Sequence, residues 1–138
     1  LDGDNLRSGL NKDLGFTPED RAENVRRVAE VAHLMYDAGL VVIVALVSPF
    51  RADRQAARSL FPDGEFIEAW VDTPIEVAME RDTKGLYAKS KSGSLPNLTG
   101  VGQQYEDPEG AELRLSGTDP VEQNVQAVIA KLLPDAVG

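Results

Sequence analysis

The amino-acid sequence predicts an α/β protein in which the strands of a parallel sheet alternate with helices. An uninterrupted, largely β-branched apolar run occupies residues 40–47, and shorter strand patterns occupy 66–71 and 112–115. A helical pattern precedes or follows each of them. Strands that alternate with helices in this way imply a parallel sheet with helices on both faces. The chain has 138 residues, enough for one domain with a sizeable core, so we expect a single domain over residues 1–138.

The first helix and the strand after it have the clearest signals. Thr17 is suited to cap a helix whose first turn contains Pro18 and two acidic residues, and Gly39 is suited to end it. Apolar residues recur between them at helical spacing. The run 40–47 contains no polar residue, which indicates a strand buried on both faces.

The remaining elements follow in alternation. We expect helices over residues 52–60, 74–81 and 119–133. The segment 85–105 is polar, contains glycine and has weak periodicity, so it is expected to be a long functional loop, a lid that spans about 84–106.

Composition excludes several functions. The chain carries 14 Lys and Arg against 23 Asp and Glu, a net charge of −9, and such an acidic balance disfavours nucleic acid as a partner. It contains no cysteine, so disulfides, thiolate catalysis and zinc–thiolate sites are excluded. The longest apolar run is too short to span a bilayer, and no signal segment opens the chain. We expect a soluble cytoplasmic protein that does not bind membranes.

Polar residues follow three expected strands, those over 40–47 and 66–71 and one that ends at Leu1. The sequence Leu1-Asp-Gly-Asp4 is typical of the exit of a buried strand, and a glycine-rich loop is expected after it. In open parallel sheets, ligands bind beyond the carboxyl ends of the strands, so these residues are expected to meet at one site. They are Asp2, Asp4, Ser48, Pro49, Phe50, Asp72 and Thr73. The chain's only histidine, His33, is expected on the polar side of its helix and away from this site. Asp4 is then the best-placed proton acceptor.

Two polar residues share the apolar stripe of the first long helix. At 100° per residue, Arg21 and Asn24 align with Val25 and Val28, at the N-terminal end of the stripe. A charged residue on a core-facing stripe needs a partner. An anionic ligand at the helix N-terminus is one candidate, and a salt bridge with a nearby acidic residue is the other.

Basic residues gather where the expected lid begins. They are Arg81, Lys84, Lys89 and Lys91, in a chain that is otherwise acidic. Such a cluster is usually a solvated face. Here it opens an irregular segment, which favours a lid that covers phosphate groups and excludes water.

Together the motifs resemble the adenylylsulfate kinase family of P-loop kinases. The resemblance covers nearly the whole chain, and the ordered set of motifs is much more specific than any one of them. It rests on Asp2-Gly-Asp-Asn-Leu-Arg7, Gly9-Leu-Asn-Lys-Asp-Leu-Gly-Phe16, Arg21-Ala-Glu-Asn24, Ser48-Pro-Phe-Arg51 with Arg54, Val71-Asp-Thr-Pro74, Lys84-Gly-Leu-Tyr-Ala-Lys89 and Leu98-Thr-Gly100.

The resemblance implies a reaction and its ligands. Members of the family transfer the γ-phosphoryl group of Mg²⁺-ATP to the ribose 3′-hydroxyl of adenosine 5′-phosphosulfate, which produces 3′-phosphoadenosine 5′-phosphosulfate in sulfate activation. Phosphoryl transfer depends on positioning and charge neutralisation more than on covalent catalysis. The family is commonly dimeric, and in some bacteria the kinase is fused to a sulfate adenylyltransferase component.

The resemblance also assigns roles to individual residues. Asp4 corresponds to the aspartate that orients the ribose hydroxyl and accepts its proton, and Asp2 would lie near the metal or support the loop, with no metal ligand firmly assigned. The implied substrate-binding residues are Asp4, Asn5, Arg7, Phe16 (stacking on the substrate adenine), Arg21, Asn24, Val47, Ser48, Lys84 and Leu98. Arg81 and Thr118 are the implied ATP contacts. Some relatives carry a phosphoserine at the position of Ser48. The alternative interpretation is that Ser48 caps the following helix.

The chain departs from the family pattern in three places. Leu98 stands where many relatives have a lid phenylalanine that closes over the adenine. The segment 101–106 also differs from the usual approach to the Tyr-Glu pair. The phosphate-binding loop G-x-x-x-x-G-K-[ST] does not occur in the 138 residues, so we expect the first strand and helix of the sheet to be missing with it. The polypeptide as written is therefore not expected to be a competent kinase.

Two alternatives stay open at this stage. One is a different small-molecule P-loop kinase, although Arg21 with Asn24 and the Lys84 motif argue against it. The other is a non-catalytic nucleotide-binding remnant that has lost its phosphate-binding loop.

Overall fold

The structure is a computed structural model that describes residues 1–82, 85–92, 98–100 and 104–133. The chain divides into two units. The first comprises Leu1–Phe66 and Leu86–Asp107, and the second comprises Ile67–Gly85 and Pro108–Gly138.

Helix α2 (Pro18–Asp37) is the longest element of the first unit and has the predicted ends. The Thr17 hydroxyl accepts a hydrogen bond from the Asp20 N–H at 3.2 Å, which satisfies one of the free N–H groups of the first turn. After the last turn, Gly39 adopts φ 83°, a left-handed conformation that glycine tolerates without strain.

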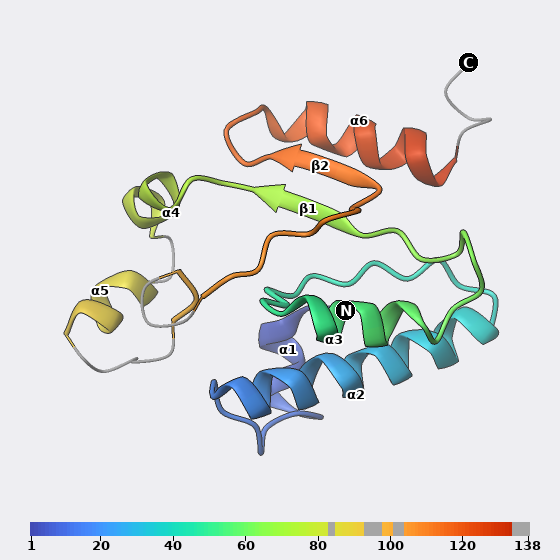
Figure 1. Ribbon diagram of the computed structural model, residues 1–138, viewed down its shortest axis with the longest axis horizontal. Coiled ribbons are helices and arrows are strands. Elements are labelled where there is room, and N and C mark those ends of the chain that lie inside the picture. Colours follow the sequence, from blue (N-terminus) through green and yellow to red (C-terminus); the bar gives the residue numbers. More distant parts are fainter. Residues whose placement is uncertain (83–84, 93–97, 101–103, 134–138) are drawn as a thin grey trace. The chain divides into compact units, whose positions relative to one another are not determined.

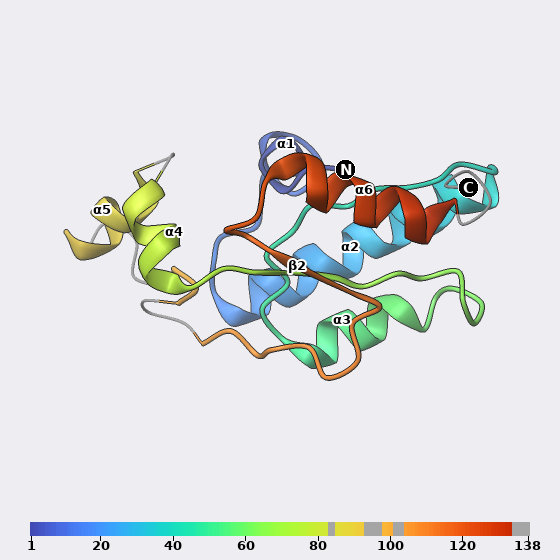
Figure 2. The ribbon, with the colours of Figure 1, turned by 90° about the horizontal axis from the view of Figure 1, so that it is seen from above.

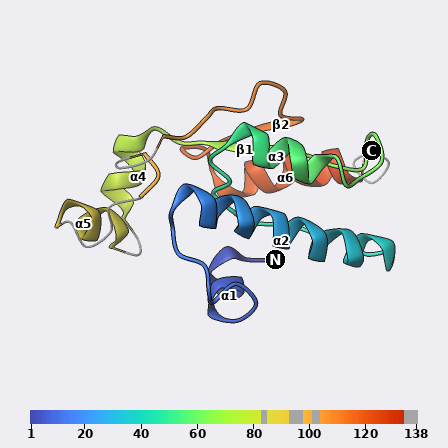
Figure 3. The ribbon, with the colours of Figure 1, turned by 60° about the horizontal axis from the view of Figure 1, so that its bottom comes forward.

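The buried stripe of α2 forms the core of the first unit. It contains Val25, Val28, Ala29 and Ala32, with Val28 only 1% exposed. As predicted, Arg21 and Asn24 continue this stripe toward the N-terminus and are buried as well. Helix α2 lies between α1 (Gly3–Ser8) and α3 (Arg51–Arg58), as Figures 2 and 3 show from two directions.

The N-terminal segment differs from the prediction. The expected strand exit is a single parallel bridge between Asp2 and Ala45, and the chain then turns directly into α1 rather than into a loop. The reason is the Asp2 side chain, whose Oδ1 accepts hydrogen bonds from the N–H groups of Asp4 (3.0 Å) and Asn5 (3.2 Å). An aspartate in this position starts a helix.

The apolar run 40–47 is not the doubly buried strand that was predicted. It is an extended segment that runs back along α2 (Figure 1), and Val41 and Ile43 are 72% and 68% exposed. Its backbone pairs with Leu1 and Gly3, through Ala45 and Ile43. A strand needs a ladder of hydrogen bonds and covered faces, and within the described residues this run has only a short partner. Apolar composition alone could not reveal that.

The segment expected to be an irregular lid contains helix α5 (Leu86–Lys91). It begins after Gly85, whose φ is 64°. Leucine, tyrosine, alanine and lysine are compatible with a helix. This helix is too short to show an apolar periodicity that could be detected in the sequence. Residues 83–84, 93–97 and 101–103 of this segment lie outside the described residues.

The second unit contains the parallel strands β1 (Ala69–Asp72) and β2 (Leu113–Ser116), side by side in Figure 1. Ala69 pairs with Leu113 and Asp72 with Ser116. Helix α4 (Ile75–Arg81) follows β1, and α6 (Val121–Leu132) follows β2 and packs against it. These elements confirm the predicted order of strands and helices and the parallel pairing. None of the helices in the described part of the chain is long and apolar enough to cross a membrane.

Gly117 is expected to be intolerant of any side chain. A Cβ built there would lie 1.7 Å from the Thr73 hydroxyl oxygen, whereas one built at Gly110 meets nothing within 4 Å. Gly117→Ala should therefore force a shift of the turn between β2 and α6 and destabilise the protein by about 1–3 kcal/mol. Urea unfolding of both variants checks this, with Gly110→Ala as the control. Equal midpoints for the two variants would contradict the expected clash.

Candidate active site

Two guanidinium groups that lie close to one aromatic ring mark the first half of the candidate site. The Cζ atoms of Arg7 and Arg21 lie 4.6 Å and 5.5 Å from the centroid of the Phe16 ring. Phe16 is nonetheless 43% exposed. Three residues that were predicted to bind substrate therefore converge, from α1, from the loop after it and from the first turn of α2. Their combination of positive charge and an accessible ring suits a ligand with an anionic group and an aromatic base.

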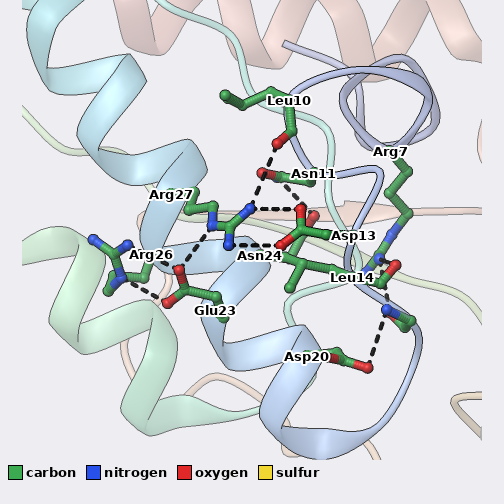
Figure 4. A network of polar contacts seen from close by, with 11 residues as sticks. Arg7, Leu10, Asn11, Asp13, Leu14, Asp20, Glu23, Asn24, Arg26 and Arg27 are labelled. Atoms are coloured by element: carbon green, nitrogen blue, oxygen red, sulfur yellow. Dashed lines mark hydrogen bonds and ion pairs between the residues drawn. The ribbon is translucent and has the colours of Figure 1, made fainter.

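Arg7 also builds the loop that carries the ring. Its Nη1 donates to the carbonyl oxygens of Leu14 (3.1 Å) and Gly15 (2.7 Å). The Gly15 N–H in turn donates to Asp20 Oδ2 at 3.0 Å. Figure 4 shows how these contacts connect α1, the loop and α2. The position of Phe16 is thus determined by charged side chains from both helices.

Burial disfavours the charged form of both guanidinium groups. Burial lowers the pKa of Arg7, while the charges of Asp20 and Asp4 act in the opposite direction. Burial also lowers the pKa of Arg21, and the positive charge of Arg7 lowers it further. Two partly buried like charges disfavour each other, and an anion bound beside them would relieve that cost.

Asn24 lies beneath this cluster and is held by a residue that was not predicted. The Asn24 Oδ1 accepts a hydrogen bond from Nδ2 of Asn11 at 3.0 Å, and Asn11 is fully buried. The Asn11 Oδ1 is buried and has no hydrogen-bond partner among the described residues. Asn11 lies in a polar stretch with no periodicity, so no signal in the sequence distinguished it from an exposed loop residue.

A salt-bridge cluster fastens the loop to α2 on the other side (Figure 4). Arg27 forms a two-pronged contact with the Asp13 carboxylate at 2.8 Å and 2.9 Å. Its Nε also donates to Glu23 Oε1 at 2.7 Å, and Arg26 contacts both oxygens of Glu23. In the structure these residues hold the loop that presents Phe16.

We expect the Glu23 carboxylate to make the stability of the protein depend on pH in the acid range. Hydrogen bonds from Arg26 and Arg27 lower the pKa of Glu23 from 4.5 to about 2. Because the folded-state pKa is depressed, the stabilisation is present above pH 4.5 and is lost as pH falls through about 2. We expect Glu23→Gln to flatten the decline of the unfolding midpoint in this range, relative to the exposed control Glu65→Gln. A parallel decline in both variants would rule out this contribution.

The Asp-Gly-Asp-Asn segment presents Asp4 and Asn5 at the start of α1, where both side chains are exposed. Asp2 serves as the helix cap described above. Asp2 and Asn5 also line an open pocket together with Leu1, Leu6, Ile43 and Ala45. Among the residues that the structure describes, no group of three His, Asp or Glu side chains is arranged to hold a metal ion.

Val47 and Ser48 end the extended segment. Val47 is 55% exposed, and Ser48 has φ 42°, which is uncommon for a residue other than glycine. The interpretation of Ser48 as a helix cap is wrong. Helix α3 begins at Arg51, and its cap residue is Phe50, whose side chain makes no cap hydrogen bond. The proline and phenylalanine between Ser48 and the helix place the hydroxyl too early in the chain.

The second unit brings together the two residues predicted to contact ATP. Arg81 Nη1 donates to the Gly117 carbonyl at 2.7 Å, directly before Thr118. The Thr118 N–H donates to Ser116 Oγ at 3.2 Å, and the two hydroxyl oxygens are 2.8 Å apart. Asp72, at the end of β1, accepts from Arg114 Nε at 2.9 Å.

Three further residues had predicted positions: His33, Leu98 and Lys84. His33 stacks on Tyr36 and meets Phe61 edge-on, with centroids 6.4 Å and 5.4 Å away. It thus belongs to an aromatic cluster at the far end of α2. Leu98 is half-buried, and Lys84 lies outside the described residues.

The comparisons with known proteins agree with this arrangement. The chain has the P-loop kinase fold: it superimposes with a TM-score of 0.90 and 44% identity on a structure described as the Mycobacterium tuberculosis APS kinase CysC in complex with AMPPNP and APS, over 96% of this chain and 78% of that one. The family model described as adenylylsulphate kinase matches residues 1–116. The chain belongs to the adenylylsulphate kinase family.

Two curated relatives are also similar to this chain over most of its length. The adenylyl-sulfate kinase of Klebsiella pneumoniae subsp. pneumoniae is 54% identical over 96% of this chain, and the bifunctional enzyme NodQ of Azospirillum brasilense is 60% identical over 86% of it. The chain spans 64% of the length of the first protein and 19% of the second.

Proposed function

We propose that the protein containing this chain phosphorylates the ribose 3′-hydroxyl of adenosine 5′-phosphosulfate with ATP, in sulfate assimilation. The observation that supports this most directly is the accessible Phe16 ring with Arg7 and Arg21 close to it. The ring offers an exposed face to a purine, and the guanidinium groups offer charge to a phosphosulfate. The Mycobacterium tuberculosis relative was solved in complex with AMPPNP and APS.

Asp4 is the proposed proton acceptor. It lies in the first turn of α1, exposed, and close enough to Arg7 to influence the pKa of that group. A carboxylate there can orient the attacking hydroxyl and take its proton as the bond to phosphorus forms. Asn5, from the same turn, would hold the ribose, and Asn24 would contact the substrate from the buried side.

ATP is the proposed phosphoryl donor, and Mg²⁺ is the metal ion proposed to accompany its phosphates. Arg81 and Thr118 in the second unit are the proposed ATP contacts. A magnesium ion bound by nucleotide phosphates keeps several waters and needs only one or two carboxylates from a protein, so the absence of a three-residue acidic cluster among the described residues is compatible with it. No metal ligand is assigned; Asp2, at the start of α1, would lie near the ion, and the ion would neutralise charge on the phosphates.

The lid and the wider assembly are also part of the proposal. Residues 84–106 would cover bound nucleotide, with Lys84 contacting its anionic groups and Leu98 covering the adenine. Relatives named bifunctional enzymes NodQ and CysN/CysC support a fusion with, or association with, a sulfate adenylyltransferase component. We further propose a cytoplasmic homodimer. A phosphoserine at Ser48 fits its position at the end of the extended segment.

A coupled assay of the full-length protein tests the function. With Mg²⁺-ATP and adenosine 5′-phosphosulfate, we expect the 3′-phosphorylated product and ADP in equal amounts. Adenosine 5′-monophosphate, which lacks the sulfate, is the control acceptor and should react poorly. The 138 residues expressed alone should be inactive, because they contain no G-x-x-x-x-G-K-[ST] loop. Failure of the full-length protein to phosphorylate adenosine 5′-phosphosulfate would refute the proposal.

A further inference from the structure

The backbone at the end of the extended segment 40–47 is held in an unusual conformation. Ser48 has φ 42°, in the left-handed region that side chains other than glycine rarely adopt. Such a conformation persists only where surrounding contacts enforce it, and it is found preferentially at functional sites. The residue after it, Pro49, is fully buried. The contacts that enforce the conformation are therefore of interest.

Arg54 supplies the contact to Ser48. It lies in α3 and is only 9% exposed. Its Nη1 donates to the Ser48 carbonyl oxygen at 2.6 Å, and its Nη2 donates to the Glu106 carbonyl oxygen at 2.7 Å. Its Cζ lies 5.5 Å from the centroid of the Tyr105 ring. One buried guanidinium thus bridges two backbone carbonyls from segments far apart in the sequence.

The segment 104–107 has further anchors that do not involve Arg54. The Glu106 N–H donates to the Pro49 carbonyl at 2.9 Å, and the Arg51 N–H donates to Glu106 Oε2 at 2.7 Å. Arg51 Nε also donates to the Asp107 carbonyl at 2.6 Å. Because these bonds remain without Arg54, its distinctive contribution is the bond to the Ser48 carbonyl.

We propose that Arg54 is a positioning residue for the substrate: it holds the Ser48 carbonyl and thereby keeps the Val47–Ser48 backbone in the conformation that meets adenosine 5′-phosphosulfate. This inference rests on the proposed function, in which Val47 and Ser48 contact that substrate. The planar fork of arginine can donate to two carbonyls at once in a fixed geometry. A lysine retains the charge but cannot reproduce that geometry.

The first test compares two matched variants of the full-length protein. Arg54→Lys should raise the KM for adenosine 5′-phosphosulfate about tenfold or more, because a buried charge-assisted contact to the presenting backbone is lost. The KM for ATP should stay within about twofold, since the change affects one substrate's binding only. Arg58→Lys, one turn along α3, is the control and should change neither value. Arg58 donates to the Phe66 carbonyl and lies over the Phe66 ring, away from Ser48.

A double-mutant cycle with Ser48→Gly separates positioning from simple stabilisation. Glycine adopts a positive φ without strain, so the backbone needs less enforcement. In the Ser48→Gly background, Arg54→Lys should raise the KM for adenosine 5′-phosphosulfate only about two- to threefold. The effect is smaller because the energetic contributions of the two neighbouring residues are coupled. Should Arg54→Lys not fold, Arg54→Gln gives the same comparison.

The outcomes distinguish this inference from the proposed function. A parent protein that does not phosphorylate adenosine 5′-phosphosulfate would refute the function. A parent that does so, with variants whose melting temperature falls but whose KM is unchanged, would show that Arg54 is only structural. An equal KM increase in both Ser48 backgrounds would overturn the link to the strained backbone.

Discussion

Asp4→Asn is expected to reduce the turnover of the full-length protein on the order of a hundredfold or more, while the fold stays intact. Asp4 is exposed in the first turn of α1, so its amide replacement disturbs no core packing. The amide keeps the shape of the side chain but cannot accept the proton of the ribose hydroxyl. General bases contribute roughly a hundred- to ten-thousandfold to rate, and the chain's one histidine is occupied in an aromatic cluster away from this segment.

Steady-state kinetics at saturating substrates, together with the melting temperature, check this expectation. Asp63→Asn makes the same chemical change at an exposed loop position and is the control. Asp2→Asn is a second comparison, because asparagine caps helices about as well as aspartate. It should preserve stability, and any loss of turnover in it would reveal a chemical role for Asp2. Near-normal turnover of Asp4→Asn would remove Asp4 from the mechanism.

Arg21→Ala is expected to weaken the binding of adenosine 5′-phosphosulfate by about 1.5–3 kcal/mol, roughly ten- to a hundredfold, and to leave ATP affinity nearly unchanged. Arg21 is 8% exposed, lies over the Phe16 ring and shares that ring with Arg7. Its removal takes away one of two positive charges that an anionic group would meet. It also relieves the repulsion felt by Arg7, so the effect on an anionic ligand is partly offset.

Calorimetric titration with each nucleotide separates the two substrates. Lys131→Ala removes an exposed cation of α6 that has no role in the site; it is the control and should change neither affinity. If Arg21→Ala weakened ATP instead, the assignments of the phosphoryl donor and acceptor would have to be exchanged.

Local patterns predicted α2 well, because its causes are local, whereas the short helices α1 and α5 were expected to be loops. Thr17, Pro18 and Gly39 define the ends of α2 through contacts within a few residues, and its 3.6-residue periodicity placed Arg21 on the buried stripe. The same was true of α4 and α6, which follow strand patterns directly. Strand β2 was also found, although its boundaries and those of β1 moved by a few residues.

What escaped prediction depends on partners distant in sequence. Whether the run 40–47 is buried depends on which strands cover it, and its own apolar side chains do not indicate which strands those are. The contact between Arg54 and Glu106 spans 52 residues, and that between Asn11 and Asn24 spans 13. Neither pair has a spacing that repeats along the chain, so only the folded backbone reveals them. The family resemblance supplied most of the site residues that spacing alone could not.

The parallel pairing of β1 and β2 has a consequence for how the chain folds. The hydrogen bond from the Glu68 N–H to Glu112 joins residues 44 apart, and most of the intervening chain belongs to the other unit. Closing so long a loop costs conformational entropy before any strand contact forms, and the cost grows with the logarithm of loop length. Helix α2, built from contacts within one turn, meets no such barrier. Refolding should therefore show early helix formation and a slower phase reported by Trp70 on β1, because non-local strand pairing is kinetically slow.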